Sequence, residues 1–295
     1  MAKARAIVKR RKAVRNIRKI TKTMQMIATA KFQKALKRAL AAKPYNRKVR
    51  EMVGELAASV GGSVEHPLLR TVDPSTAKNR VALLVITSNR GLAGAYNGNI
   101  LRTTMSFIRE RKARQTQIDL YLSGKKGASY FNFHKYPITE RYDQFADAPR
   151  FEDASKVADQ LMARFIAGEV DAVHVGYMNF QSSAVQKAEV LTLLPLGGVV
   201  TAAAEKKQTA VYDFYPEERT LLDELLPLTV RTTLYQCFLD ATTSENVARM
   251  VAMKAATDNA DEMVKSLTMQ YNRARQSQIT TELSEIMGGV EAMKA

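Results

Sequence analysis

Two glycine-bearing stretches in the middle of the chain are the first candidates for chemistry. One runs from 88 to 98 and carries three glycines directly after an apolar run. A glycine-bearing turn between a strand and a helix can bind phosphate, because the free amides of the helix N-terminus face the ligand. The spacing matches neither GxGxxG nor GxxxxGK[ST], and Gly124-Lys125-Lys126-Gly127 fails both patterns too. This favours tight turns and packing over phosphate binding, which stays the alternative.

The other reactive residue types are dispersed. His66, His134 and His174 form no HExxH pair and have no cysteine partner, so the sequence predicts no catalytic zinc. Cys237 is the only cysteine, which excludes an intramolecular disulfide and a CxxC site. Its apolar neighbours indicate a buried, inert thiol, and no GxSxG nucleophile elbow is present. We therefore expect no catalytic residues, no cofactor and no enzymatic activity of the chain by itself.

The middle of the chain has the pattern of an α/β domain. A near-continuous apolar run at 80–88 is typical of a strand buried on both faces. Strands and helices then alternate, which implies parallel strands, until three strands arrive without helices between them. The predicted strands lie at 80–88, 118–122, 138–142, 169–180, 184–196 and 210–215, with helices ending at 111 and spanning 125–133 and 151–167. We expect a Rossmann-like domain over 75–216 with a mixed, mostly parallel sheet.

Both ends of the chain are predicted to be long helices. Residues 1–43 contain neither glycine nor proline and consist mostly of strong helix formers. Residues 228–287 also lack both, and at 1.5 Å per residue they would span about 90 Å, until Gly288-Gly289 supplies a stop signal. We expect helical segments at 1–60 and 217–295 that pair as a long antiparallel coiled coil.

The predicted seam of this coiled coil follows a spacing of four and three residues. Its members in the first helix are Ala13, Ile17, Ile20, Met24 and Ile27. Its members in the second helix are Ala256, Ala260, Met263, Leu267, Gln270 and Ala274. Small seam residues allow two helices to approach closely, which favours a thin rod.

The charge is concentrated at the N-terminus. Residues 1–50 hold 18 basic side chains and no acidic one, whereas the net charge of the whole chain is +16. Such a block suits nucleic acid, an anionic membrane or an acidic protein. No run of 18 apolar residues exists, so we expect no membrane span. A nucleic-acid-binding protein is the alternative function, although Phe32 and Tyr45 are the only aromatic residues of the basic segment.

Four stretches resemble one protein family. The segment at 18–28, RKITKTMQMIA, resembles the KITKAMxMVA stretch of F-type ATP synthase gamma subunits, bacterial type. The segments MVAMKAATDNA at 250–260 and YNRARQSQITTELSEI at 271–286 are similar to the C-terminal signature of that family. The loop at 88–98 also resembles the family's S-x-RGLxGxxN segment.

The resemblance implies a function as a central rotor shaft. In that family the coiled coil stands inside a hexamer of alternating alpha and beta subunits, and the α/β domain sits on the ring of c subunits beside epsilon. Ion flow through the c-ring turns the shaft, which opens and closes the nucleotide sites of the beta subunits in turn. The implied location is the cytoplasmic side of the bacterial plasma (inner) membrane, as a peripheral, non-catalytic subunit of a proton-translocating complex.

The resemblance also implies contact residues. Met24 matches a position near the acidic lever segment of a beta subunit, and Arg249 and Glu282 match the network that supports this contact. Arg275 and Gln276 match the place where a beta loop catches the C-terminal helix. Thr280 lies one turn further on. Tyr212 and Tyr215 match the foot that rests on the c-ring.

Overall fold

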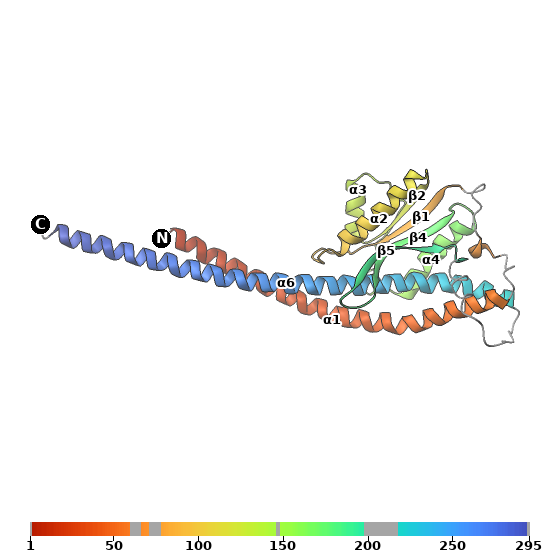
Figure 1. Ribbon diagram of the computed structural model, residues 1–295, viewed down its shortest axis with the longest axis horizontal. Coiled ribbons are helices and arrows are strands. Elements are labelled where there is room, and N and C mark those ends of the chain that lie inside the picture. Colours follow the sequence, from red (N-terminus) through yellow and green to blue (C-terminus); the bar gives the residue numbers. More distant parts are fainter. Residues whose placement is uncertain (1, 60–65, 71–77, 146–147, 198–217, 294–295) are drawn as a thin grey trace. The chain divides into compact units, whose positions relative to one another are not determined.

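The computed structural model describes residues 2–59, 66–70, 78–145, 148–197 and 218–293 (Figure 1). These residues belong to two compact units, which are described separately below. Met1–Thr29 and Arg249–Ala295 make up one unit, and Ala30–Ala248 makes up the other. Two long helices contribute to both units, namely α1 (Ala2–Ser59) and α6 (Glu218–Ala292).

The unit of residues 30–248 is built around one five-stranded sheet with the order β3-β2-β1-β4-β5. Its strands are β1 Arg80–Ile86, β2 Gln117–Ser123, β3 Glu140–Tyr142, β4 Ala172–Phe180 and β5 Gln186–Leu194. The first four run parallel and β5 pairs antiparallel with β4. The prediction of a mixed, mostly parallel sheet is confirmed.

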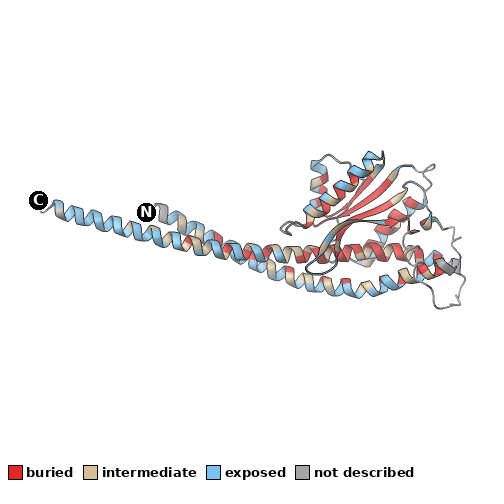
Figure 2. Cartoon of the chain, in the orientation of Figure 1, coloured by how far each residue is buried: buried red, intermediate tan, exposed pale blue. Residues whose placement is uncertain are grey.

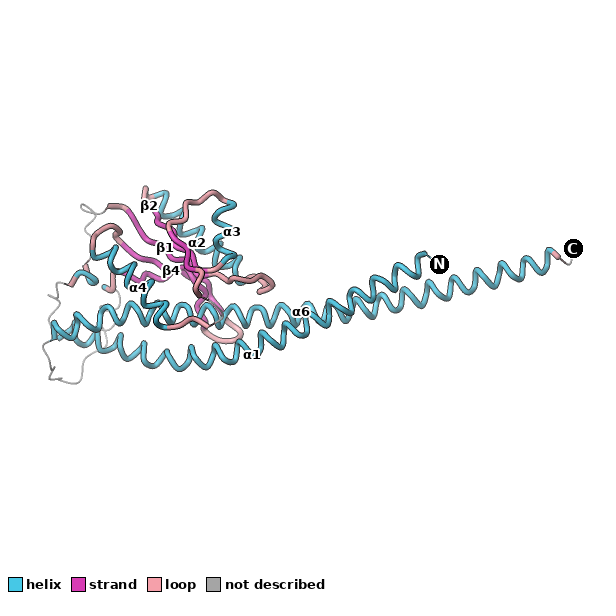
Figure 3. The backbone as a smooth tube through the Cα atoms, turned by 180° about the vertical axis from the view of Figure 1, so that it is seen from behind, coloured by secondary structure: helices cyan, strands magenta, loops and turns pink. Residues whose placement is uncertain are grey.

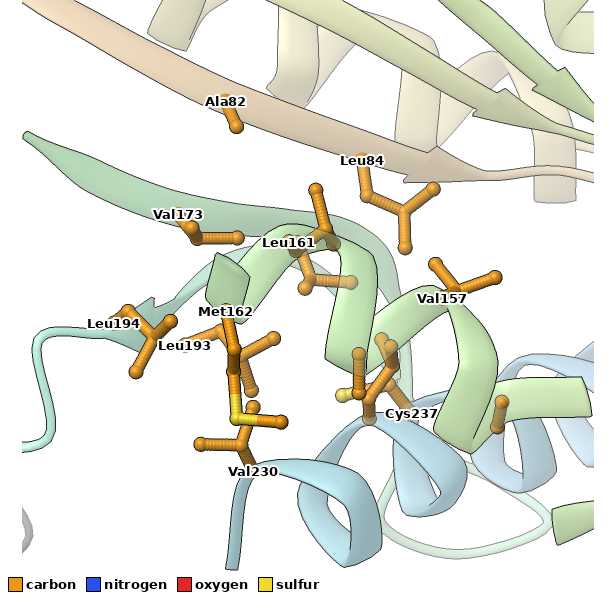
Figure 4. Close-up of a cluster of buried hydrophobic side chains, with 14 of the residues drawn as sticks. Ala82, Leu84, Val157, Leu161, Met162, Val173, Leu193, Leu194, Val230 and Cys237 are labelled. Atoms are coloured by element: carbon orange, nitrogen blue, oxygen red, sulfur yellow. The ribbon is translucent and has the colours of Figure 1, made fainter. Parts of the chain in front are cut away.

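Helices cover both faces of this sheet. One face packs on α2 (Tyr96–Ala113) and α3 (Lys125–Phe133), through a cluster that includes Leu83, Val85 and Phe131. The other face packs on α4 (Phe151–Ile166) and α6, where Leu161 and Val230 lie beneath the strands (Figure 4). Helices cover both faces of central β1, so its side chains are buried on both sides. This explains its continuous apolar run.

The parts of α1 and α6 in this unit pack through regular stripes. In α6 the buried positions include Leu222, Leu226, Val230, Leu234, Phe238 and Ala241. Spacings of four and three residues place them on one face of the helix. Asn46 of α1 donates to the Thr232 carbonyl at 3.1 Å, and the guanidinium of Arg50 donates to the Thr233 hydroxyl at 3.0 Å. These polar contacts join α1 and α6 beside the sheet.

The helix predictions were correct in kind and partly wrong in their ends. The structure places α3 at the predicted residues and α4 within one residue of them. Gly288-Gly289 does not stop α6, which continues to Ala292. Two glycines cost a helix about 2 kcal/mol, but they end it only when the chain must turn into a left-handed residue. The strand predicted at 210–215, and residues 198–209 of the preceding loop, lie outside the described residues.

Candidate functional site

The glycine loop at 88–98 is closed by its own hydrogen bonds. Asn97 accepts from the Ser88 amide at 3.0 Å, and its Nδ2 donates to the Ser88 hydroxyl at 2.8 Å. At the start of α3, the amides of Lys125, Lys126 and Gly127 donate to Asn89 Oδ1, the Ser88 carbonyl and Thr87 Oγ1. These amides are the donors that a phosphate would need, and the protein already uses them. Gly124 and Gly127 therefore serve the turn before α3 and its packing against Thr87.

A small cavity lies beside this loop, at the carboxyl ends of β1 and β2. It measures about 40 Å³, and its lining includes Thr87, Ser123, Phe238 and Asn246. Nucleotide pockets measure several hundred Å³, so this cavity is too small for one. Side chains of α6 occupy the crevice where open α/β sheets usually bind ligands. In this fold, helix α6 therefore lies in the crevice.

Burial holds two ionisable side chains of this unit, Cys237 and His174, in their neutral forms at neutral pH. Burial raises the pKa of the Cys237 thiol, and the nearby Asp240 adds to the effect, so the thiol is not a nucleophile at neutral pH. Burial, with Arg111 nearby, lowers the pKa of His174 to about 4. The prediction of an inert thiol is confirmed. No group of three or more metal-ligating side chains occurs in the described part of the chain.

The unit formed by the chain ends is an antiparallel coiled coil. Arg11 of α1 stacks over Tyr271 of α6, whereas Thr21, further along α1, meets Thr257, which lies earlier in α6. The two helices therefore run in opposite directions, and both chain termini point toward the same end of the pair (Figure 1). The prediction of an antiparallel coiled coil is confirmed.

The observed seam of α1 is displaced by one residue along the sequence from the predicted seam. Val14, Thr21 and Ala28 are buried, with a spacing of seven. The predicted members Ile17, Ile20 and Ile27 are between 52% and 60% exposed, Ala13 is exposed, and Met24 is half-buried. The prediction chose the more apolar of two adjacent faces, and that choice was wrong.

The seam of α6 was predicted in part. Ala260 and Leu267 are buried and pack with Val14 of α1, as expected for seam residues. Met263 is 44% exposed and Gln270 is exposed, so these two predicted members are wrong. The buried positions of α6 in this unit are Met253, Thr257, Ala260 and Leu267, and the predicted members Ala256 and Ala274 are half-buried. The contact between the helices therefore combines large apolar residues with small and polar ones.

Three polar contacts cross this seam. The Thr257 hydroxyl donates to Thr21 Oγ1 at 2.8 Å, and both threonines are at most 9% exposed. Arg18 forms an ion pair with Asp261. The Arg11 guanidinium lies 5.0 Å from the centre of the Tyr271 ring. The sequence reasoning missed all three contacts, although a seam displaced by one residue would have indicated them.

Most of the expected contact residues are on the outside of this coiled coil. Arg275, Gln276, Thr280 and Glu282 are exposed on α6, whereas Arg249 is half-buried. Gln278 donates to Glu282 at 2.8 Å, and Thr280 donates to the Gln276 carbonyl at 3.0 Å. Arg249 and Glu282 are separated by 33 residues of one helix, or about 50 Å, so the structure does not bring them together. Tyr212 and Tyr215 lie outside the described residues.

The last turns of α6 extend beyond the first turn of α1 (Figures 1 and 3). Every residue from 281 to 290 is exposed, as the pale blue end of this helix in Figure 2 shows. Besides Met287, the exposed large apolar residues from 279 to 290 are Ile279, Leu283, Ile286 and Val290. Their spacing of four, three and four residues is that of a helix face that packs against a partner. Among the described helices, none is long and apolar enough to cross a lipid bilayer.

Comparison with known proteins gives the family. A family model described as ATP synthase matches residues 3–293. The ATP synthase gamma chain of Rhodopirellula baltica is 44% identical over 299 residues, with 100% of both chains covered. The chain belongs to the ATP synthase gamma chain family. Another member, the ATP synthase gamma chain of Leptospira biflexa, is 41% identical and covers 99% of this chain and 100% of its own.

Solved structures share the fold of this gamma-chain family member. A chain in the cryo-EM structure of the Euglena gracilis mitochondrial ATP synthase, OSCP/F1/c-ring, rotational state 3, superimposes with a TM-score of 0.66. The match covers 99% of this chain and 95% of that chain at 19% identity. A chain in the rotor structure of the same enzyme, rotational state 1, gives a TM-score of 0.62 over 94% of this chain. Terminal helices around a middle α/β domain are thus a fold found in ATP synthase structures.

Proposed function

We propose that this chain is the central rotor shaft of an F1Fo ATP synthase. It couples ion flow through the c-ring to conformational cycling of the catalytic beta subunits, and it performs no bond chemistry itself. Family membership over residues 3–293 and the gamma-chain relatives support this function. The observation that carries it is the long coiled coil whose apolar and basic side chains face outward. Such a rod can act on partners only through contacts on its sides and its end.

The partners we propose are the alpha and beta subunits, the epsilon subunit and the c-ring. A ring of alpha and beta subunits would surround the coiled coil and cover the apolar face of the last α6 turns. An acidic segment of each beta subunit suits the basic outer face of α1, because residues 1–50 carry no carboxylate that would repel it. The alpha, beta, epsilon and c subunits would place the protein on the cytoplasmic side of the bacterial plasma membrane, attached through the c-ring.

The individual contacts follow the same reasoning. We propose that Met24 meets the beta lever, with Arg249 and Glu282 supporting the shaft at separate points. Arg275, Gln276 and Thr280 would meet a beta loop, which their exposure on α6 supports. Tyr212 and Tyr215 would contact the c-ring.

A nucleic-acid-binding function has less support. Phe32, one of two aromatic residues in the basic segment, packs against Phe180 at a ring distance of 6.2 Å and is not available for base stacking. Arg11 and Arg18 are engaged by α6. Neither the family nor its relatives suggest this function.

Reconstitution tests the rotor function. The purified chain should show no ATPase activity alone, and it should restore cooperative ATP hydrolysis when it is mixed with alpha and beta subunits. Co-assembly is measured by size-exclusion chromatography and hydrolysis by phosphate release. A chain that binds DNA tightly in a salt-dependent way, and does not assemble with alpha and beta, would favour the nucleic-acid alternative.

A further inference from the structure

Helix α1 carries two adjacent faces that could each form the coiled-coil seam. The face in use holds Val14, Thr21 and Ala28. The isoleucine face, defined as Ala13, Ile17, Ile20, Met24 and Ile27, lies one residue away along the sequence and is largely exposed. One residue corresponds to a rotation of about 100° around the helix axis. A rotation of this size would exchange the two faces.

Hydrophobic burial alone favours the other face. An isoleucine side chain has more apolar area than a threonine or alanine side chain, and apolar area removed from water stabilises a contact. The isoleucine face offers three isoleucines and a methionine. The face in use offers one valine, one threonine and one alanine over the same stretch. Another interaction must therefore hold α1 in the observed orientation.

The buried threonine pair has the geometry for this role. The Thr257 Oγ1 lies 2.8 Å from Thr21 Oγ1 and 2.8 Å from the Met253 carbonyl, so its single proton is shared between the two, and Thr21 donates to the Arg18 carbonyl. Rotation of one helix would break the buried bond between the two hydroxyls, so this bond favours one orientation. Thr21 cannot meet Thr257 if Ile20 takes its place in the seam.

Two more contacts lie between the threonine pair and the chain ends, and they hold α1 in the same orientation. Arg18 pairs with Asp261, and Arg11 stacks over Tyr271 at 5.0 Å. The Arg18 and Asp261 side chains are 49% and 43% exposed, so their pair contributes little to stability by itself. The contribution of this ion pair is to fix the orientation of α1 against α6. Together the contacts fix the direction of α1 over almost three turns.

We propose that Thr21–Thr257, Arg18–Asp261 and Arg11–Tyr271 are positioning pairs that set the rotation of α1 against α6. They keep the isoleucine face outward, where a partner can reach it. The rotation itself is a property of the isolated chain. Its consequence, that the outward face including Met24 is presented to the subunits around the shaft, rests on the proposed rotor function.

The test removes the α6 half of each pair and leaves α1 intact. The variant Thr257→Val, Asp261→Ala, Tyr271→Leu keeps the three isoleucines and the methionine of the isoleucine face. Two reporters read the rotation by maleimide labelling of the full chain. Ala13→Cys lies on the exposed isoleucine face, and Ala28→Cys lies in the seam. The native Cys237 is 2% exposed, so its labelling reports unfolding.

In the otherwise unchanged chain, Ala13→Cys should react at least about tenfold faster than Ala28→Cys, because burial protects a thiol. In the triple variant this ratio should fall below one, with Cys237 still protected. Conservative changes should restore the original ratio, since Thr257→Ser keeps the hydroxyl, Asp261→Glu the charge and Tyr271→Phe the ring. A merely destabilising effect would not produce this pattern.

The control variant is Asp258→Ala with Thr281→Val. Both residues are exposed on α6, and Thr281 bonds a carbonyl four residues earlier just as Thr257 does. It should leave the labelling ratio unchanged. An unchanged ratio in the triple variant would overturn the proposal, because the rest of α1 would then set the rotation. Fast labelling of both reporters would also overturn it, since the helices would have separated without rotating. Labelling needs no other subunit. A labelling result that overturns the positioning pairs therefore leaves the rotor function untouched, and a failed reconstitution leaves the positioning pairs untouched.

Discussion

At the scale of single residues, Gly124 shows why one position in the loop region permits no side chain. Its φ is +98°, and a Cβ atom there would lie 2.1 Å from the Thr87 carbonyl oxygen. Gly98 is different, because no atom lies within 4 Å of its Cβ position and it sits inside α2. Similar glycines of the sequence therefore have opposite structural roles.

These two glycines give a matched pair of substitutions. Gly124→Ala should lower the free energy of unfolding by at least about 3 kcal/mol, through overpacking and an unfavourable backbone angle. Gly98→Ala should raise it by up to about 1 kcal/mol, because alanine restricts the unfolded chain. Urea denaturation followed by circular dichroism measures both values. Equal effects of the two changes would contradict the packing described for Gly124.

His174 makes the stability of the middle domain depend on pH. The ring is 3% exposed between α2 and β5, lies 4.8 Å from the Phe107 ring, and its Nδ1 is 3.2 Å from the Thr192 hydroxyl. Its pKa is about 4 in the folded chain, against 6.5 for an ordinary histidine. Between pH 6.5 and pH 4, His174 therefore binds a proton in the unfolded chain but stays neutral in the folded chain. Stability falls as the pH drops from 6.5 toward 4.

Replacing this histidine should remove that part of the pH dependence. The loss of stability between pH 7 and pH 5 should be about 2 kcal/mol smaller in His174→Gln than in the unchanged chain. Asp240, whose pKa is raised to about 6, contributes the opposite slope to both proteins, so it cancels in the comparison. Urea midpoints at the two pH values give the result. His134→Gln, at an exposed position, should behave like the unchanged chain.

At the scale of elements, the end of α6 is a helix whose apolar face has no neighbour among the described residues. Residues 281–290 are exposed, although Leu283, Ile286 and Val290 lie on one face. Packing gives most helices their stability, so this segment depends on whatever surrounds it. Under the proposed function, the surrounding subunits supply that packing.

A charge on this face should weaken assembly and leave the isolated chain intact. Ile286→Lys should reduce the affinity for alpha and beta subunits at least about tenfold, because it places an ammonium group in an apolar contact. The stability of the isolated chain should change by less than about 0.5 kcal/mol, as for other exposed positions. Thr281→Lys, on the opposite face, is the control. Equal losses of affinity in both variants would mean that the apolar face is not the contact.

At the scale of the whole molecule, basic side chains and the outward isoleucine face lie on the same helix. The first 50 residues contain 18 basic and no acidic side chains, and α6 engages Arg11 and Arg18. The outer surface of α1 therefore combines positive charge with exposed isoleucine side chains. This combination suits an acidic partner with an apolar contact region.

Met24 offers a test of this surface in the complete enzyme. Met24→Lys should lower the number of ions pumped per ATP hydrolysed, because it adds a charge beside the seam, where under the proposed function the shaft meets a beta subunit. Reconstituted vesicles allow proton uptake and phosphate release to be measured together. Met24→Leu, which keeps an apolar side chain of similar size, should retain full coupling. Normal coupling in the lysine variant would place the lever contact elsewhere on the shaft.

Some features of this protein follow from the sequence alone. The continuous apolar run of β1, the alternation that produces α3 and α4, and the glycine- and proline-free ends are local patterns, so they predicted the mixed sheet and the paired helices. The resemblance at 18–28 and 250–286 indicated the family because long stretches of such similarity seldom arise by chance. Neither inference required knowledge of which residues touch.

Tertiary structure decided what local patterns leave open. The heptad of α1 allows two seams one residue apart, and apolar content favours the one with Ile17 and Ile20. The observed seam depends on Thr257 and Asp261, which lie more than 200 residues away and become neighbours only in the folded chain. The amides of α3 look free in sequence, yet side chains and carbonyls of the 88–98 loop occupy them. In both cases a partner distant in sequence satisfies a polar group, and that partner selects one of several locally equivalent structures.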